Sequence, residues 1–180
     1  MEWVTVYDLR EDTKRIAQIQ HATVNTEDYG LVPEPALFGS DEWWSAVADG
    51  RVETHTSEGV VSDVRWESMG DWPGWTFTAE NGSESRWTRE GDYTRYVEGL
   101  AARITWAVVS HKPTNIKGLA TAGRIHNMLI RVDLEASDVR SEQAAPGPLA
   151  LMEKMQREAA QRQSGTRPGW PPWRRSRSGE

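Results

Sequence analysis

Apolar and polar residues alternate along much of this chain, and this period of two constrains the fold more than any other feature of the sequence. Successive side chains of a β-strand point to opposite faces of a sheet, whereas a helix repeats its apolar positions every three or four residues. Turn residues separate the alternating stretches. The pattern predicts eight strands, at residues 3–7, 16–24, 52–56, 60–67, 75–79, 83–88, 102–110 and 124–135.

Eight short strands joined by turns are typical of an all-β or β-rich domain. We therefore expect a mainly β fold, either a small antiparallel β-barrel or a strongly bent sheet, with residues 51–110 as one antiparallel meander. Residues 59–110 resemble OB-like and SH3-like barrels in layout, a likeness of fold that carries no motif and implies no function. The strand at residues 16–24 has an alternative, because residues 10–21 could also form a helix.

Two segments have the spacing of helices. Residues 41–49 follow Ser40, a favourable N-cap, and we expect them to form a helix that plugs one end of the sheet. An amphipathic helix is expected at residues 147–163. Residues 164–180 contain too many Pro, Gly and Arg residues to pack, so we expect a disordered basic tail. A β-rich globular domain at residues 1–146 would precede both segments.

The composition excludes several classes of protein. The chain has no cysteine, which excludes disulfide scaffolds, thiolate zinc sites, iron–sulfur clusters and cysteine nucleophiles. No stretch approaches the roughly 18 apolar residues of a membrane-spanning helix. The first residues have neither the basic nor the apolar region of a signal peptide. We therefore expect a soluble cytoplasmic protein.

Charge is distributed unevenly along the chain. Residues 1–149 carry 14 basic and 24 acidic side chains, whereas residues 150–180 carry seven basic and three acidic ones. An acidic body repels the phosphate backbone that supplies most nucleic-acid affinity. Contact with nucleic acid is therefore expected only through the basic tail.

Tryptophan is unusually abundant, with ten Trp against two Phe. Trp66, Trp75, Trp87 and Trp106 lie on predicted strands, where alternation places them with the apolar residues. A surface on which bases or sugars stack would have to face solvent. We therefore expect these four side chains in the core.

The hairpin around Asn81 and Gly82 tests this interpretation through its register. A two-residue loop would place Trp75 and Trp87 on opposite faces of the sheet. A three-residue loop, with Gly82 in the left-handed region as a bulge, places the two indoles opposite each other on one face. Because burial of a large apolar side chain contributes roughly 1.5 to 3 kcal/mol, we expect the bulged loop.

Trp72 differs from these residues, since it lies with Asp71 in a loop of turn residues between two predicted strands. An aromatic residue in such a loop can anchor a partner, or it can fold back and cap the end of the sheet. Trp43 and Trp44 are adjacent on the predicted helix and point about 100 degrees apart, so one of them should be partly exposed. Trp72, Asp71 and Trp44 are the candidate binding residues of the body.

The predicted tail also combines aromatic and basic residues. Trp170 and Trp173 flank two prolines, a composition typical of extended segments that bind aromatic grooves. Arg174, Arg175 and Arg177 follow and could contact phosphates. These five residues are the candidate binding residues of the tail, and the alternative is a tail that only aids solubility.

No sequence pattern indicates catalysis, a metal site or a cofactor. The four histidines are far apart and lack the spacings of metal ligands: His21, His55, His111 and His126. The chain also lacks the glycine loops that bind phosphates and the Gly-x-Ser-x-Gly motif of hydrolases. We therefore assign no catalytic residue, metal ligand or cofactor.

These features favour a non-enzymatic binding or regulatory module that contacts a protein partner through the aromatic loop of Trp72. The acidic body favours a basic partner. Two alternatives stay open. One is a nucleic-acid-associated accessory protein that uses the basic tail. The other is a small enzyme, which would require two or more histidines to meet a carboxylate in one pocket.

Overall fold

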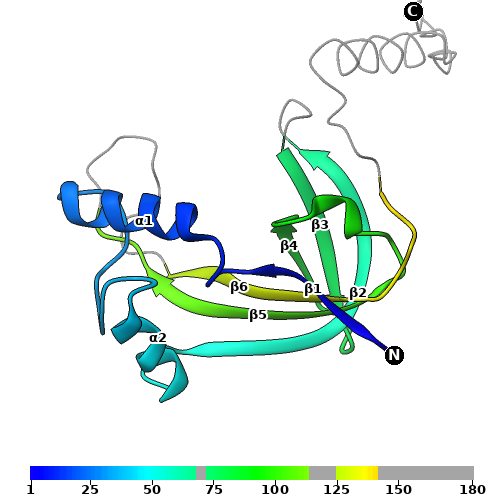
Figure 1. Cartoon of the computed structure of the whole chain (residues 1–180), viewed down its shortest axis with the longest axis horizontal. Coiled ribbons are helices and arrows are strands. Elements are labelled where there is room, and N and C mark those ends of the chain that lie inside the picture. Colours follow the sequence, from blue (N-terminus) through cyan, green and yellow to red (C-terminus); the bar gives the residue numbers. More distant parts are fainter. Residues whose placement is uncertain (68–71, 114–124, 142–180) are drawn as a thin grey trace, which may run out of the picture.

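The computed structural model describes residues 1–67, 72–113 and 125–141 of the 180-residue chain. Within these residues, six antiparallel strands form one sheet and two helices lie beside one end of it (Figure 1). The elements are β1 (Trp3–Asp8), α1 (Thr13–Asn25), α2 (Asp41–Ala48), β2 (Thr54–Glu67), β3 (Trp72–Ala79), β4 (Glu84–Thr88), a 3-10 turn (Tyr93–Arg95), β5 (Ala101–Ser110) and β6 (Ile125–Glu135). The strand order is β1-β6-β5-β2-β3-β4. The helix expected at residues 147–163 and the tail at 164–180 lie outside the described residues.

The sheet bends along β2, which is 14 residues long. The first half of β2 pairs with β5 from Thr54 to Val60, and its second half pairs with β3 from Gly59 to Glu67. β3 and β4 consequently rise over the rest of the sheet (Figure 1). The separate strands expected at residues 52–56 and 60–67 are therefore a single curved strand.

The sheet does not close into a barrel, so the barrel alternative was wrong and a bent open sheet is observed. Within the described residues, β1 pairs with β6 alone and β4 pairs with β3 alone, whereas closure would require a ladder between β1 and β4. The segment after β4 approaches β1 instead. A Cβ atom at Gly91 would lie 2.1 Å from the carbonyl oxygen of Val6. The two ends of the sheet thus meet through a backbone contact rather than through paired strands.

The strand expected at residues 16–24 was wrong, because this segment belongs to helix α1. Asp12 caps the helix, and its side chain accepts a hydrogen bond from the Arg15 N–H at 3.0 Å. Thr23 is buried, while Ile16 and Ile19 are partly buried and pack against the core. These positions recur at the three- to four-residue spacing of a helix. One helical face therefore determines the structure of a segment whose sequence also alternates.

Helix α2 confirms the helix predicted after Ser40. The Ser40 side chain accepts a hydrogen bond from the Trp43 N–H at 3.2 Å. Trp43 and Ala46 are buried, and Trp44 is only partly buried. The expectation that one of the two adjacent tryptophans is partly exposed is therefore confirmed.

The β3–β4 hairpin has the predicted register. Trp75 lies opposite Trp87, and Gly82 adopts a φ of 81° in the three-residue loop. Trp75 is fully buried, as expected for the core. Trp87 and Trp106 are partly buried, and their ring centroids are 5.9 Å apart. Trp66, the fourth tryptophan expected in the core, is also partly exposed rather than fully buried.

Candidate functional site

A cleft of about 750 Å³ lies between α1 and the raised part of the sheet formed by β3 and β4. α1 and the segment after it supply one side, the beginning of β3 and the end of β4 supply the other, and β5 and β6 run beneath (Figure 1). We call it the aromatic cleft, because Tyr29 and Trp72 line it. It brings together residues that are far apart in the sequence.

Large apolar side chains are exposed at the rim of the aromatic cleft. Trp72 is 54% exposed and Tyr29 is 49% exposed. The Trp72 ring is nevertheless held in place, since its Nε1–H donates a hydrogen bond to Thr88 Oγ1 at 3.1 Å. An exposed indole with a fixed orientation is a common anchor in protein interfaces. Trp72 is the first residue of β3 rather than part of a loop, and the adjacent Asp71 lies outside the described residues.

An ion pair between Arg15 and Glu90 crosses the cleft and joins α1 to the segment after β4. The side chains are 31% and 18% exposed. Burial lowers the pKa of Arg15, but the hydrogen bond and the negative charge of Glu90 together raise this pKa by more, so the net direction is upward. The charged pair therefore persists at neutral pH and fixes α1 relative to the sheet.

Two histidines meet beside this ion pair. The ring centroids of His111 and His126 are 5.5 Å apart, with the rings edge to face. Burial lowers the pKa of His126, and the charges of His111 and Arg15 lower it further. His126 is therefore neutral at neutral pH.

His111 lines the cleft together with the carboxylates of Asp12 and Glu90, and His126 lies beside His111. Within the described ranges, neither His111 nor His126 forms a hydrogen bond with a carboxylate, and Glu90 is engaged by Arg15. Among the described residues, no three or more histidine and carboxylate side chains are placed so that they could hold a metal ion. His55 lies elsewhere, bonded to Glu53 at 2.8 Å.

The other candidate binding residues lie outside the aromatic cleft. Trp44 lines a separate groove between α1 and α2, where the guanidinium of Arg10 lies 4.6 Å from the centroid of its ring. The candidates of the tail lie outside the described residues: Trp170, Trp173, Arg174, Arg175 and Arg177. Of the two candidates that the structure describes, Trp72 lines the aromatic cleft and Trp44 does not.

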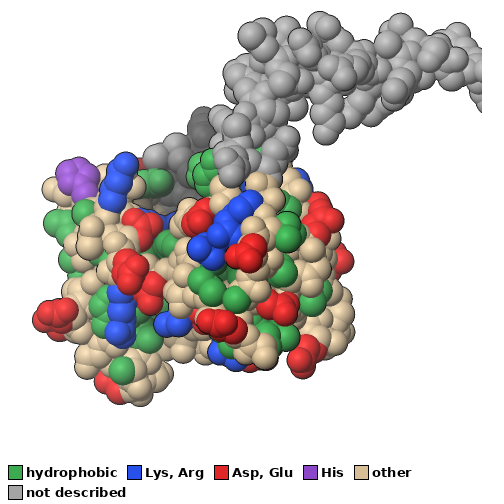
Figure 2. All heavy atoms as spheres, turned by 45° about the vertical axis from the view of Figure 1, so that its right-hand side comes forward, with side chains coloured by type: hydrophobic (Ala, Val, Ile, Leu, Met, Phe, Trp, Pro, Cys, Tyr) green, Lys and Arg blue, Asp and Glu red, His purple; other side chains and the backbone are tan. Residues whose placement is uncertain are grey.

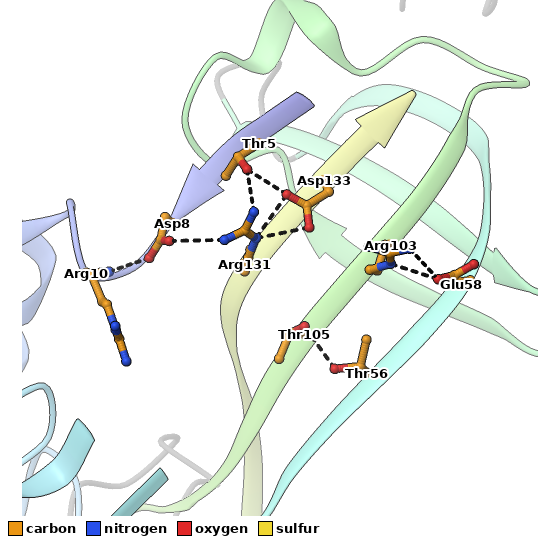
Figure 3. A network of polar contacts seen from close by, with 9 residues as sticks. All are labelled: Thr5, Asp8, Arg10, Thr56, Glu58, Arg103, Thr105, Arg131 and Asp133. Carbon is orange, nitrogen blue, oxygen red and sulfur yellow. Dashed lines mark hydrogen bonds and ion pairs between the residues drawn. The ribbon is translucent and has the colours of Figure 1, made fainter. Parts of the chain in front are cut away.

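On the face of the sheet opposite the cleft, polar side chains form hydrogen bonds and ion pairs with one another (Figure 3). Arg131 donates to Asp133 at 3.0 Å and to Thr5 at 2.7 Å, and it also lies near Asp8. Further along this face, the hydroxyls of Thr56 and Thr105 are 3.0 Å apart. Such a network stabilises the sheet surface internally, and none of the described residues of this face is an aromatic side chain as exposed as Trp72.

Sequence reasoning missed Tyr29, Arg15 and Glu90 as members of the site. Arg15 and Glu90 are separated by 75 positions. No local spacing or motif joins them. Only the packing of α1 against the end of β4 brings them into contact.

A comparison with protein families gives one match. Residues 3–127 match the model of a family described as immunity protein RhsI2. The matched region extends from β1 into β6 and includes Tyr29, Trp72, Glu90, His111 and His126. No curated protein matches the chain. Within the described residues, no helix is long and apolar enough to cross a membrane.

Proposed function

Because the chain belongs to the RhsI2 immunity protein family, we propose that it binds the cognate Rhs toxin through the aromatic cleft and thereby inhibits it. Membership of an immunity protein family implies protein–protein binding without catalysis by the chain itself. We assign the toxin-binding site to the cleft because two exposed aromatic side chains, Trp72 and Tyr29, line it and belong to the matched region.

The structure of the cleft suits a protein partner. Trp and Tyr are enriched among the residues that dominate binding energy, especially where they are held in a defined orientation. Thr88 orients the Trp72 ring, and the ion pair of Arg15 with Glu90 holds α1 against the sheet. The partner would therefore meet a rim that needs little reorganisation, which favours affinity.

Charge supports a basic toxin surface. The first 149 residues carry ten more acidic than basic side chains. On the face seen in Figure 2, acidic side chains are spread out and mixed with basic and hydrophobic ones, rather than gathered in one patch. A distributed negative charge increases the rate at which a basic partner approaches more than it determines where that partner docks. We also propose that binding takes place in the cytoplasm, in keeping with a cysteine-free sequence.

A titration tests the proposal. The probe is the toxin domain of an Rhs protein from the same genome, chosen because co-expression of the wild-type chain restores growth of cells that produce it. A variant carrying Trp72→Ala and Tyr29→Ala should bind this domain at least about 100-fold more weakly, since each anchor contributes roughly 2 kcal/mol. Thr56→Ala, on the opposite face, is the control and should bind like the wild type. Equal affinity of the double variant and the control would refute the location.

A further inference from the structure

Among the strand edges in the described part of the chain that have no neighbouring strand, two line the same hollow. β4 pairs with β3 along one edge only. Residues 125–129 of β6 pair with β5 alone, because the ladder between β1 and β6 begins at Arg131. The chain of β1 leaves the sheet just after Leu9, whose N–H donates to the Ile130 carbonyl at 2.8 Å. We call the space between the free edges of β4 and of residues 125–129 the seam.

A hollow of about 540 Å³ occupies the seam. Residues 85–88 of β4 line it, together with residues 125–127 and Leu129 of β6. The hollow adjoins the aromatic cleft, since Arg15 and Glu90 line both. The seam is therefore next to the surface that we assign to the toxin.

The hydrogen bonds of the hairpin show which backbone groups of β4 point into the seam. The N–H of Arg89, directly after β4, donates to the Pro73 carbonyl at 2.8 Å. Residues that bond to the neighbouring strand alternate with residues that point away from it. Trp87 therefore bonds to β3, whereas the N–H and C=O of Arg86 point into the seam. Within the described residues, no hydrogen bond occupies these two groups of Arg86.

The other end of the sheet is shielded, which distinguishes it from the seam. The backbone at Gly91 lies against Val6, and β1 has an irregularity in its pairing between Thr5 and Tyr7. A bulge and a covering segment are two of the ways in which proteins protect an edge strand from pairing with another chain. β4 has no bulge in its ladder with β3 and contains no proline. Within the described residues, the β4 edge at the seam thus lacks both of these protections.

The charges around the seam specify the chemistry of its occupant. Arg15 and Glu90 compensate each other. His126 is neutral at neutral pH, as argued above. Arg86 makes no ion pair with any described residue. Among the described residues, one positive charge is therefore left without a counter-charge, beside two backbone groups for which no hydrogen bond is formed.

We propose that an extended segment of the toxin enters the seam as an additional strand along β4, with an acidic side chain opposite Arg86 and apolar side chains toward Trp87. Main-chain hydrogen bonds supply affinity in such strand addition, and alternate side chains supply specificity. The spacing of paired strands, about 4.8 Å, lets one inserted strand reach both edges if they lie about 10 Å apart. This inference rests on the proposed function, because the toxin supplies the strand.

A proline substitution tests the strand addition directly. Arg86→Pro removes the N–H that points into the seam without removing a hydrogen bond to β3, and proline is tolerated at such edge positions. Arg86→Ala is the matched control, since it removes the charge but keeps the N–H. With the same toxin domain as above, Arg86→Ala should weaken binding about two- to fivefold. Arg86→Pro should weaken it about tenfold further. Equal affinities of the two variants would overturn the proposal.

Hydrogen exchange on the wild-type complex is the second measurement, and it stands even if Arg86→Pro fails to fold. The amide of Arg86 should exchange at least about tenfold more slowly in the complex than in the free chain, because binding buries it in a hydrogen bond. An unchanged exchange rate on binding would contradict strand addition. Protection of the Arg86 amide in the free chain would also contradict it, because another segment of this chain would then occupy the seam. Loss of binding in the Trp72 and Tyr29 variant with no effect at Arg86 would leave the proposed function intact and refute the seam. A wild-type chain that binds no toxin would refute both.

Discussion

The contact between Gly91 and Val6 makes a quantitative prediction about how the two ends of the sheet are held together. Gly91 has a φ of 68°, and Gly82 in the hairpin loop has a φ of 81°. Replacing either by alanine therefore costs about 1 kcal/mol for the left-handed backbone conformation. The two sites differ in space, because a Cβ at Gly82 meets no atom within 4 Å, whereas a Cβ at Gly91 would lie 2.1 Å from the Val6 carbonyl oxygen.

Gly91→Ala should therefore lose stability for a second reason that does not apply to Gly82→Ala. The segment at Gly91 has to move away from β1, and it carries Glu90, whose side chain pairs with Arg15 and whose carbonyl accepts the Tyr96 hydroxyl at 3.0 Å. Overpacking of this kind costs about 1 to 3 kcal/mol. We expect the free energy of unfolding to fall by about 1 kcal/mol for Gly82→Ala and by about 2 to 4 kcal/mol for Gly91→Ala.

Urea unfolding at pH 7, followed by far-UV circular dichroism, measures both variants against the wild type. The slopes with urea should be equal, so that the midpoints report the difference in stability. Equal destabilisation by the two substitutions would refute the close approach of Gly91 to β1. It would also remove the argument that this end of the sheet is shielded.

Three further predictions concern single side chains and the tail. Trp75→Ala should lower the free energy of unfolding by about 3 to 5 kcal/mol, because Trp75 is fully buried. Trp72→Ala should chiefly weaken toxin binding. A Trp72→Ala variant that unfolds as early as Trp75→Ala but binds the toxin normally once folded would make Trp72 structural. The pKa of His126 is lower in the folded than in the unfolded chain, so unfolding takes up a proton at mildly acidic pH. The free energy of unfolding should therefore fall as the pH drops below about 6.5. In urea titrations, His126→Gln should flatten this decline. If the basic tail contacts nucleic acid as predicted, the full chain should bind DNA or RNA weakly in gel-shift titrations at two salt concentrations, and removal of residues 164–180 should abolish this binding. Tight binding by the shortened chain would contradict the role predicted for Arg174, Arg175 and Arg177.

Local rules predicted those parts of the fold that depend on neighbours in the sequence. The bulged hairpin followed from Gly82 and from the pairing of Trp75 with Trp87, which are close in the chain. Helix α2 followed from its cap at Ser40. In both cases the residues that select the structure lie within about one turn or one hairpin of each other.

Distant contacts were not predictable in this way. The α1 segment alternates like a strand, and the burial of Ile16 and Ile19 against the core selects the helix. The open sheet depends on where β1 stops pairing with β6, which no local pattern encodes. The aromatic cleft likewise requires α1 to meet the end of β4. Trp72 could be identified as a candidate because it breaks the pattern of buried tryptophans, whereas nothing in its local sequence marked Tyr29.

Photocrosslinking measures most directly whether the toxin occupies the aromatic cleft. A photoreactive phenylalanine derivative is placed at position 72 on the rim, or at position 56 on the opposite face, and each chain is irradiated with the toxin domain that it neutralises. Both positions are exposed, so each reports contact with little disturbance of the core. We predict a covalent adduct with the toxin from position 72 and none from position 56. An adduct from position 56 alone would contradict the assignment of the cleft as the toxin-binding site.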